Sequence, residues 1–408
     1  MKKKMLAASA ALLITVMIIA LAGCGNASSG TAGSTQTGTA QTSDPAPSGN
    51  TSDTQTVVAE GSDLFTTRDL TQNPDLSGAQ YITVTDGQTV NITEEGIYVL
   101  SGSARDAVIA VDAGDDDKVQ LVLDGLYIEN AHQCCILVEN ADKVFITSVE
   151  DSVNTLAVSG KFTSDEDAVI FSRDDLVLNG LGAVKISSTG DGIRSNDEIK
   201  ITGGTWNVTA SDGAIKAHEG IYACAGTCSL TAGGDGLHAE NNDDDTAGSV
   251  VIEGGSFTIR AGDDGIHATT QAVIEGGSIT ISAAEGIEAT QVIINGGELG
   301  ISASDDGINA GKKSNSMGVR IEINGGDITI VMGAGDTDGV DSNGDLIITG
   351  GRIDVTAQSP FDYDGSCTYT GGTIIVNGEE TNSVTNQMMG PGGGGPGGGP
   401  GANPGGRP

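Results

Sequence analysis

The chain has 408 residues, of which 63 are glycine and only 3% are aromatic, and its formal net charge is −36. A field of this sign repels nucleic acids and anionic lipids, so neither is expected as a partner, and an acidic polymer would need a bridging cation. Such a chain has too few large aromatic side chains to fill a conventional globular core. A solenoid, in which each repeat contacts only its neighbours, needs only a thin one.

The first 24 residues are typical of an export signal. Three lysines precede an apolar stretch at residues 5–21, which is short for a membrane-spanning helix, and Leu21-Ala22-Gly23 leads into Cys24. This ending resembles the bacterial lipobox, which implies that Cys24 is lipidated and becomes the new N-terminus. We therefore expect an extracellular protein, lipid-anchored to the outer face of the bacterial cytoplasmic membrane, with a flexible Ser/Thr/Gly linker at residues 25–61.

Residues 62–380 repeat one pattern of short apolar runs that end at glycine. The second glycine of a GG or AG pair recurs at steps of 20 to 29 residues, at Gly204, Gly226, Gly255, Gly277, Gly297, Gly326, Gly351 and Gly372. Three short strands and three turns in about 21 residues make one coil of an all-β parallel β-helix, of about 13 coils in total. We expect residues 62–76 to cap its open end and the Gly/Pro-rich tail at 381–408 to be disordered.

Inward-facing positions of successive coils align as three apolar rows. The rows are Ile201, Ala223, Ile252, Ile274, Ile294, Ile323 and Ile348; Trp206, Cys228, Phe257, Ile279, Leu299, Ile328 and Ile353; and Ile193, Ile215, Leu237, Ile266, Ile287, Ile308 and Val340. Such rows make a continuous core, which places Trp206 inside rather than on a sugar-binding surface. The five cysteines after Cys24 lack metal-ligand spacing, and a Cys224–Cys228 disulfide stays open as an alternative.

One turn of the coil carries an acidic row. Aligned on the glycine of the DG pair, the preceding position reads Asp191, Gly213, Asp235, Asp264, Glu285, Asp306 and Asp338. Carboxylates about 5 Å apart repel by about 3 kcal/mol at an effective dielectric of 20. Oxygen-only ligands of this kind fit Ca²⁺, so the predicted calcium ligands are Asp235, Asp263, Asp264, Glu285, Asp305, Asp306 and Asp338. The alternative is that Asp-Gly merely makes a good turn.

The outward positions of the third strand run from basic to acidic along the stack. They read Arg194, Lys216, His238, His267, Glu288, Asn309 and Asp341. We expect His238 and His267 to be vertical neighbours. The first four residues are candidates for ligand binding, for example of a uronate carboxylate. The alternative is that they are exposed strand residues that serve solubility.

Several segments before and within the repeats resemble sequences of a known protein family. They are DKVQLVLDGLYIEN (117–130), ENADKVFIT (139–147), DDLVLNG (174–180) and DEIKITGG (197–204). With the GG and DG repeats and the lipobox, they make residues 96–378 resemble the bacterial carbohydrate-binding-domain family of surface β-helix proteins. The resemblance implies a right-handed parallel β-helix with bound Ca²⁺ that binds plant cell-wall polysaccharide, cellulose and polygalacturonate among them, without known catalysis. The resemblance implies calcium sites only along the DG row. Gly213, Glu285 and Thr337 depart from the double-Asp pattern of that row.

The sequence thus predicts an extracellular, membrane-anchored carbohydrate-binding protein that is not an enzyme and carries calcium. Two alternatives stay open. A pectate-lyase-like enzyme would need an Arg or Lys beside a calcium-held uronate, and Arg194, Lys216 and Arg260 are the basic candidates near the row. A fold shared with lyases is analogy and does not establish this activity. A structural or adhesive surface protein would instead bind another protein.

Overall fold

The computed structural model of the chain describes residues 63–334 and 337–386. These residues form 34 β-strands and no helix, so none of them lies in a helix able to cross a membrane. Their strand pairings are all parallel except that of β33 (Thr373–Val376) with β34 (Glu379–Thr381). The predicted signal peptide with Cys24, the linker and the tail from residue 387 lie outside the described residues.

The strands form three parallel ladders, which we number by their order within each repeat. The first ladder contains β1 (Gln80–Val84), β3 (Gly96–Arg105), β5 (Lys118–Asn130), β7 (Lys143–Ser148), β10 (Asp175–Gly180), β13 (Glu198–Ile201), β16 (Gly220–Ala223), β19 (Ser249–Ile252), the second halves of β21 (Asp264–Ile274) and β23 (Glu285–Ile294), β26 (Arg320–Ile323), β29 (Asp345–Ile348) and β32 (Cys367–Tyr369). The second ladder runs from the ends of β3 and β5 through β8 (Val153–Val158), β11 (Ala183–Ser188), β14 (Thr205–Ala210), β17 (Thr227–Ala232), β20 (Ser256–Arg260), β22 (Ser278–Ala283), β24 (Glu298–Ala303), β27 (Asp327–Met332) and β30 (Arg352–Thr356) to β33. The third ladder contains β2 (Thr89–Ile92), β4 (Val108–Asp112), β6 (Ile136–Asn140), β9 (Ala168–Ser172), β12 (Asp191–Ser195), β15 (Ile215–Ala217), β18 (Leu237–Ala239), the first halves of β21 and β23, β25 (Asp306–Ala310), β28 (Asp338–Ser342) and β31 (Ser359–Tyr363).

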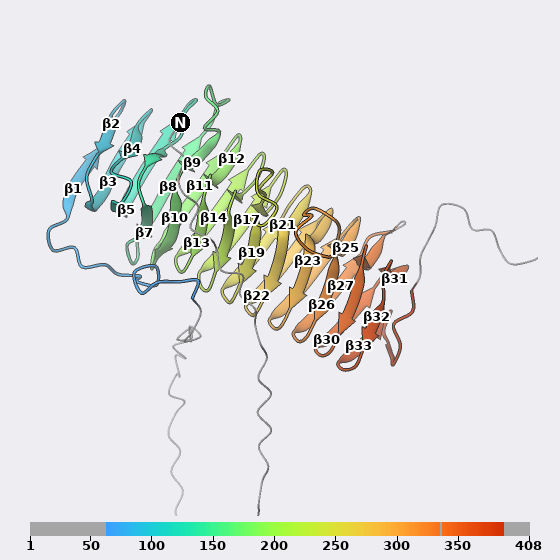
Figure 1. The fold of residues 1–408 in the computed structure, drawn as a ribbon. Coiled ribbons are helices and arrows are strands. Elements are labelled where there is room, and N and C mark those ends of the chain that lie inside the picture. The colour runs from blue at the N-terminus through green and yellow to red at the C-terminus, as the bar shows by residue number, and fades with distance from the viewer. Residues whose placement is uncertain (1–62, 335–336, 387–408) are drawn as a thin grey trace, which may run out of the picture. The chain divides into compact units, whose positions relative to one another are not determined.

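The chain visits the three ladders in a fixed order, and its strands follow one another along a single stack (Figure 1). Each repeat from β3 to β31 therefore adds one segment to every ladder. The register confirms the three predicted core rows, as in the opposed pairs Ile252–Ile274, Phe257–Ile279 and Ile266–Ile287.

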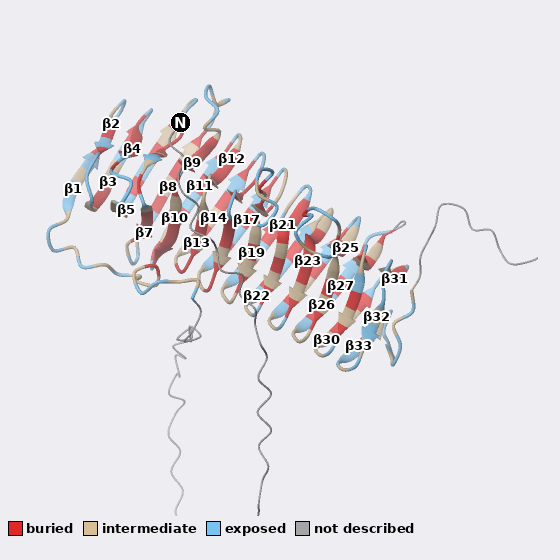
Figure 2. Cartoon of the chain, viewed as in Figure 1, coloured by how far each residue is buried: buried red, intermediate tan, exposed pale blue. Residues whose placement is uncertain are grey.

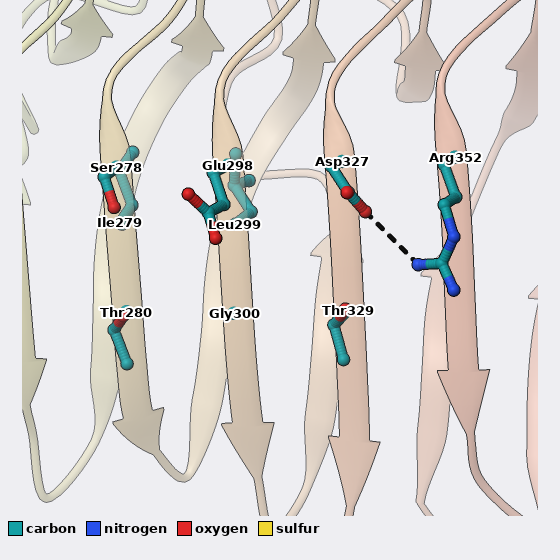
Figure 3. Close-up of a pocket in the computed structure, with 9 residues that line it drawn as sticks. All are labelled: Ser278, Ile279, Thr280, Glu298, Leu299, Gly300, Asp327, Thr329 and Arg352. Atoms are coloured by element: carbon teal, nitrogen blue, oxygen red, sulfur yellow. Dashed lines mark hydrogen bonds and ion pairs between the residues drawn. The ribbon is translucent and has the colours of Figure 1, made fainter. Parts of the chain in front are cut away.

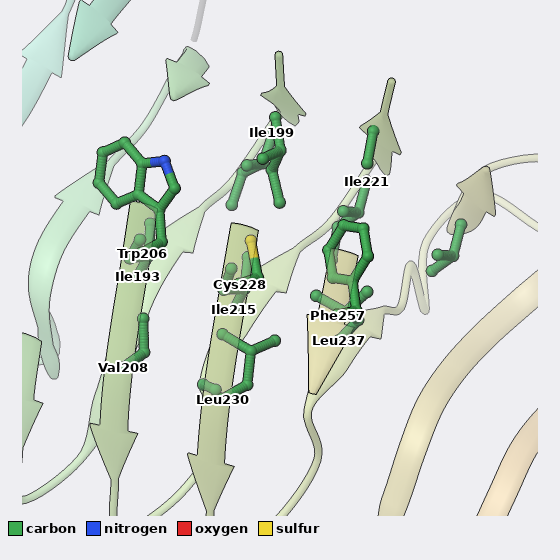
Figure 4. Packing of buried hydrophobic residues seen from close by; sticks show 14 of the residues in the cluster. Ile193, Ile199, Trp206, Val208, Ile215, Ile221, Cys228, Leu230, Leu237 and Phe257 are labelled. Atoms are coloured by element: carbon green, nitrogen blue, oxygen red, sulfur yellow. The ribbon is translucent and has the colours of Figure 1, made fainter. Parts of the chain in front are cut away.

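The core is a thin column of apolar side chains between the ladders, because in most strands alternate residues are buried, as the burial colours show (Figure 2). Trp206, Cys228 and Phe257 of the second ladder are at most 1% exposed and pack against residues of the other two (Figure 4). The indole nitrogen of Trp206 donates to the Gly203 carbonyl oxygen (2.9 Å), which satisfies its polar atom in the core. The prediction for Trp206 is confirmed. All five described cysteines are unpaired, so Cys224 and Cys228 form no disulfide.

The second glycine of each GG pair fixes the start of the second ladder. Gly255, Gly277 and Gly297 have φ values of 99°, 93° and 90°, a left-handed conformation that side chains disfavour. A Cβ atom on Gly277 would also lie 2.9 Å from the carbonyl oxygen of Gly255 in the neighbouring coil. The spacing of these glycines in the sequence therefore gives the length of each repeat.

Most of the segment predicted to cap the open end, residues 62–76, lies elsewhere in the structure. Its first described part, the flank segment (residues 63–72), runs along the side of the stack by β10 and β13 (Figure 1). There Asn179 donates from Nδ2 to the Asp69 carbonyl oxygen (3.2 Å), and the Thr202 hydroxyl donates to the same oxygen. The polar side chains on the outer face of these strands offer several hydrogen bonds to the flank segment, which explains why it lies there.

Two insertions follow strands of the third ladder and contact each other. They span residues 240–248, after β18, and residues 311–319, after β25. The Ser314 hydroxyl donates to the Asp245 carbonyl oxygen (2.6 Å). The second insertion also carries Lys313 to the neighbouring coil, where this residue contributes to the site described next.

Candidate functional site

The two predicted charge rows lie side by side at the start of the third ladder. The corner row contains Asp191, Asp235, Asp264, Glu285, Asp306 and Asp338, and the outward row contains Arg194, Lys216, His238, His267, Glu288, Asn309 and Asp341. We call the two rows together the corner strip. The register pairs Asp264 with Glu285 and Asp306 with Asp338, so the predicted stacking of these acidic positions is confirmed.

The Asp-Gly pair has a structural role in each corner. A Cβ atom on Gly286 would lie 2.2 Å from the carbonyl oxygen of Gly307, so the corner tolerates no side chain there. Asp235 uses Oδ1 to accept the backbone N–H of Asp264 in the next coil (2.9 Å). The turn interpretation therefore accounts for the glycine and for one carboxylate oxygen. The surroundings of the other oxygen differ along the strip.

In the basic half of the strip, which runs from Asp191 to His267, the carboxylates face basic side chains. Asp191 is 1% exposed and lies 3.5 Å from Lys216 Nζ and 3.8 Å from Arg194 Nη1. Asp235 Oδ2 lies 2.5 Å from His238 Nδ1. Basic side chains thus lie close to Asp191 and Asp235, although burial still raises the pKa of Asp191 to about 6.

His267 is held between two carboxylates. Its Nδ1 lies 2.6 Å from Asp264 Oδ2 and 3.0 Å from Glu288 Oε2, and Lys313 Nζ lies 2.5 Å from Glu288 Oε1. Burial opposes the positive charge, but the hydrogen bonds to the two carboxylates outweigh it and raise the pKa of His267 to about 10. The rings of His238 and His267 stack with centroids 4.7 Å apart, which confirms that they are vertical neighbours.

The acidic half of the strip comprises Glu285, Asp306, Asn309, Asp338 and Asp341 and contains no basic residue, whereas Glu288 between them is paired with His267 and Lys313. Among the described residues, Glu285, Asp306 and Asp341 form no ion pair. Burial, reinforced by neighbouring carboxylates, raises the pKa of Glu285 and of Asp306 to about 7 and that of Asp341 to about 6. Asn309 donates from Nδ2 to Glu285 Oε2 (3.0 Å), while its own Oδ1 is buried without a hydrogen-bond partner. This half thus presents oxygen atoms whose charge is not balanced locally.

Several predicted calcium ligands come together in the structure. Carboxylate oxygens of Asp235, Asp263 and Asp264 lie within 4.8 Å of one another. The ligand atoms of Asp264, His267 and Glu288 form a second group within the same span. The remaining predicted ligands continue the row in later coils: Glu285, Asp305, Asp306 and Asp338.

A pocket of about 250 Å³ lies beside the basic half and brings three of the four predicted ligand-binding residues together. Arg194, Lys216 and His238 line it together with His218, which the sequence did not single out because it follows β15 and belongs to none of the rows. Arg194 Nη1 lies 2.9 Å from Asp167 Oδ1, and Lys216 and His238 face carboxylates of the strip. The pocket therefore offers little free positive charge to a sugar carboxylate.

A second surface lies on the outer face of the second ladder, where hydroxyl groups point to solvent (Figure 3). Thr280 and Thr329 occupy equivalent outward positions, and Gly300 stands between them in the register. The missing side chain leaves a polar groove of about 200 Å³, bordered by the ion pair of Asp327 with Arg352 (3.2 Å). The sequence analysis missed this groove. The available signal was the alternation of Ser and Thr along the second strands, interrupted at Gly300.

These features define an all-β protein with a long, mostly parallel sheet and open, polar surfaces. A family model described as carbohydrate-binding domain-containing protein matches residues 86–337. Because the match spans more than half of the chain, the chain belongs to this family, as the resemblance of the repeats indicated.

Two known proteins are similar to the chain. A carbohydrate-binding domain-containing protein of Acetivibrio thermocellus is 37% identical over 128 residues, which cover 30% of this chain and 45% of that protein. The match thus spans less than half of the relative's length. A polysaccharide lyase-like protein from C. thermocellum, solved as a gadolinium derivative, is 29% identical over 54% of this chain and 96% of its own, with a TM-score of 0.49.

Proposed function

We propose that the protein binds acidic plant cell-wall polysaccharide, such as polygalacturonate, outside the cell and without catalysis, through Ca²⁺ held by the acidic half of the corner strip. The observation that carries the proposal is that, among the described residues, the carboxylates of Glu285, Asp306 and Asp341 form no ion pair, in a member of a carbohydrate-binding family. The net charge of −36 means that an acidic polymer needs a bridging cation.

The proposal includes the architecture that displays this row. Three parallel ladders visited in a fixed order are accounted for by a right-handed parallel β-helix with coils of about 21 residues. In such a fold each coil contributes one corner to the strip. An acidic residue at the corner position of the repeat therefore becomes a continuous row of carboxylates along the strip.

Calcium fits the acidic half because every donor there is an oxygen atom. Glu285, Asp306, Asp338 and Asp341 would supply carboxylates, and the buried Oδ1 of Asn309, which has no hydrogen-bond partner, would supply an amide oxygen. A bound cation would balance carboxylates that burial otherwise keeps from ionising. Coordination positions that the protein leaves open would accept a uronate carboxylate.

The other predicted calcium group, Asp235, Asp263 and Asp264, has the closer cluster of carboxylates but fewer free oxygen atoms. Its oxygens lie within 4.8 Å of one another. However, Asp235 and Asp264 each direct one oxygen at a histidine, so a calcium ion there would compete with existing partners.

A neutral glucan such as cellulose would use a different surface. The outer face of the second ladder exposes Thr280 and Thr329 around the Gly300 groove, and its hydroxyl groups can exchange hydrogen bonds with sugar hydroxyls. A Cβ atom at Gly300 would meet no atom within 4 Å. A substitution there therefore fills the groove without disturbing the backbone.

The arrangement of basic residues supports binding rather than a lyase reaction. A lyase needs an uncommitted base beside the bound uronate. Arg194 and Lys216 lie within ion-pair distance of Asp191, and Arg260 is an exposed residue of β20 in the second ladder. Incubation with polygalacturonate and calcium should produce no ultraviolet-absorbing unsaturated products, and clear turnover would refute this part of the proposal.

The proposed extracellular location depends on Cys24, which lies outside the described residues. The wild-type protein should fractionate with membranes and incorporate labelled fatty acid, and Cys24→Ala should do neither. An unlabelled wild-type protein that remains in the cytoplasm would refute the anchor without affecting the calcium site.

The calcium bridge is tested by retention on insoluble polygalacturonate. Wild-type protein should be retained in calcium and released by EGTA. The double variant Asp306→Asn/Asp341→Asn should lose retention, whereas Asp116→Asn/Asp124→Asn, which removes the same charge from exposed positions outside the strip, should keep it. Retention that ignores EGTA would refute the bridge.

Retention on cellulose tests the second surface. Gly300→Gln should weaken it, whereas Thr231→Gln, on the same face in β17 but outside the groove, should not. If folded wild-type protein binds neither polygalacturonate nor cellulose, the adhesive alternative, in which the surface binds a protein, becomes the better account.

A further inference from the structure

Asp264, His267 and Glu288 form a group that differs in kind from the rest of the corner strip. Asp264 and His267 belong to β21 and Glu288 to the adjacent β23. The Nδ1 atom of His267 lies 2.6 Å from an oxygen of Asp264 and 3.0 Å from an oxygen of Glu288. The carboxyl-bearing residues are 5% and 8% exposed. Three potential ligand atoms therefore converge at a largely enclosed point from two neighbouring coils.

One imidazole nitrogen and two carboxylate oxygens are a donor set for a borderline metal such as zinc rather than for calcium, which prefers oxygen alone. We propose that Asp264, His267 and Glu288 bind a divalent transition metal of the Zn²⁺ class. This site is separate from the calcium positions of the acidic half and does not depend on carbohydrate binding.

The residues around the group are arranged as supports for metal ligands. Lys313 Nζ lies 2.5 Å from Oε1 of Glu288, which leaves Oε2 directed at His267. The ring of His238 stacks on that of His267 with an interplanar angle of 11°, which restrains the orientation of the imidazole. Such outer contacts fix the direction of metal ligands in known sites.

In the absence of metal, a proton on Nδ1 of His267 joins the two carboxylates. A metal ion would replace this proton at the same point, with a small outward movement of the three side chains to reach bond lengths of about 2.0–2.2 Å. Three protein ligands leave at least one coordination position for water or for an oxygen of a ligand. The neighbouring group of Asp235, Asp263 and Asp264 contains no nitrogen donor and is not expected to share this preference.

The test is a zinc titration of the purified, tag-free protein by calorimetry, after treatment with EDTA and in saturating calcium. Wild-type protein should bind one Zn²⁺ per chain despite the calcium. His267→Gln should weaken the binding by at least about tenfold. The matched control is His132→Gln, which removes an exposed histidine far along the chain from the group and should bind as tightly as wild type.

Cobalt(II) provides a second readout, because coordination by nitrogen and oxygen at a low-symmetry site gives visible absorption bands. These bands should appear in wild type and His132→Gln and be absent in His267→Gln. If His267→Gln does not fold, Glu288→Gln serves in its place. Zinc affinity that is the same in wild type and the site variants, or no zinc binding by folded wild-type protein, would overturn the proposal.

Discussion

The two halves of the corner strip share one backbone but differ in how they balance charge. In the basic half, Asp235 and Asp264 lie 2.5 and 2.6 Å from the histidines three positions later. In the acidic half, the residue three positions after Asp306 is Asn309, and the one after Asp338 is Asp341. The identity of this one outward residue therefore decides whether a coil neutralises its own corner or requires a counter-ion.

Breaking the basic half should have the largest effect. In EDTA, His267→Gln should lower the free energy of unfolding by about 3 kcal/mol, because Asp264 and Glu288 lose the cation between them while remaining buried. Urea unfolding measures this change. The exposed-histidine control His132→Gln should stay within about 0.5 kcal/mol of wild type, and a loss in His267→Gln no larger than this would contradict the comparison.

Supplying a counter-ion to the acidic half should have the next largest effect. Calcium at 100 times its dissociation constant should stabilise the wild-type protein by about 2.7 kcal/mol, seen as a higher melting temperature than in EGTA. Asp306→Asn/Asp341→Asn should lose most of this gain. Identical wild-type melts in calcium and in EGTA would show that the acidic half needs no metal.

Removing a single charge from the acidic half should stabilise the metal-free protein. In EGTA at neutral pH, Asp306→Asn should raise the free energy of unfolding by about 1 kcal/mol, because the repulsion between carboxylates about 5 Å apart is relieved and solvent screens part of it. This sign is opposite to that of His267→Gln in the basic half. Destabilisation by Asp306→Asn would mean that its hydrogen bond to the Asp338 N–H (3.2 Å) outweighs the repulsion.

The pH dependence should distinguish the two halves by the pH range in which the free energy of unfolding changes. The pKa of Asp306 rises from 3.8 to about 7 on folding, so the folded chain binds more protons between these values and stability falls as pH rises from about 4 to 7. The pKa of His267 rises from 6.5 to about 10. Its contribution is therefore complete below about pH 6.5 and is lost as pH rises towards 10.

Unfolding measured across pH checks these two windows. Calcium should flatten the slope between about pH 4 and 7 and leave the upper one, whereas His267→Gln in EDTA should remove the upper slope and leave the lower one. A single change that removed both slopes would show that the halves titrate as one unit.

The sequence predicted the parts of the molecule that repeat. The GG glycines require positive φ, as at Gly277 (93°), and strands alternate inward and outward, so aligning the repeats gave the correct core rows and the His238–His267 stack. The corner carboxylates were placed correctly for the same reason. What the alignment could not reveal was that the histidines are the partners of those carboxylates, because this depends on side-chain direction.

The features that the sequence missed lie outside the repeat. Lys313 reaches Glu288 from an insertion that has no register with the strands. The flank segment was expected at the open end, but its partners Asn179 and Thr202 are more than 100 residues away along the chain. Contacts between a non-repeating segment and a distant coil leave no periodic signal.

The position of the flank segment has a mechanical consequence. Although it precedes β1 in the chain, Gln72 fastens it to the side of the stack by accepting the Gly180 N–H (2.9 Å) and donating to the Thr202 carbonyl oxygen (2.8 Å). Tension applied to the chain before residue 63 would enter the stack at these bonds, beside β10 and β13. The coils from β1 to β6 would then carry no load, and such a pull would not unravel the stack from its first strand.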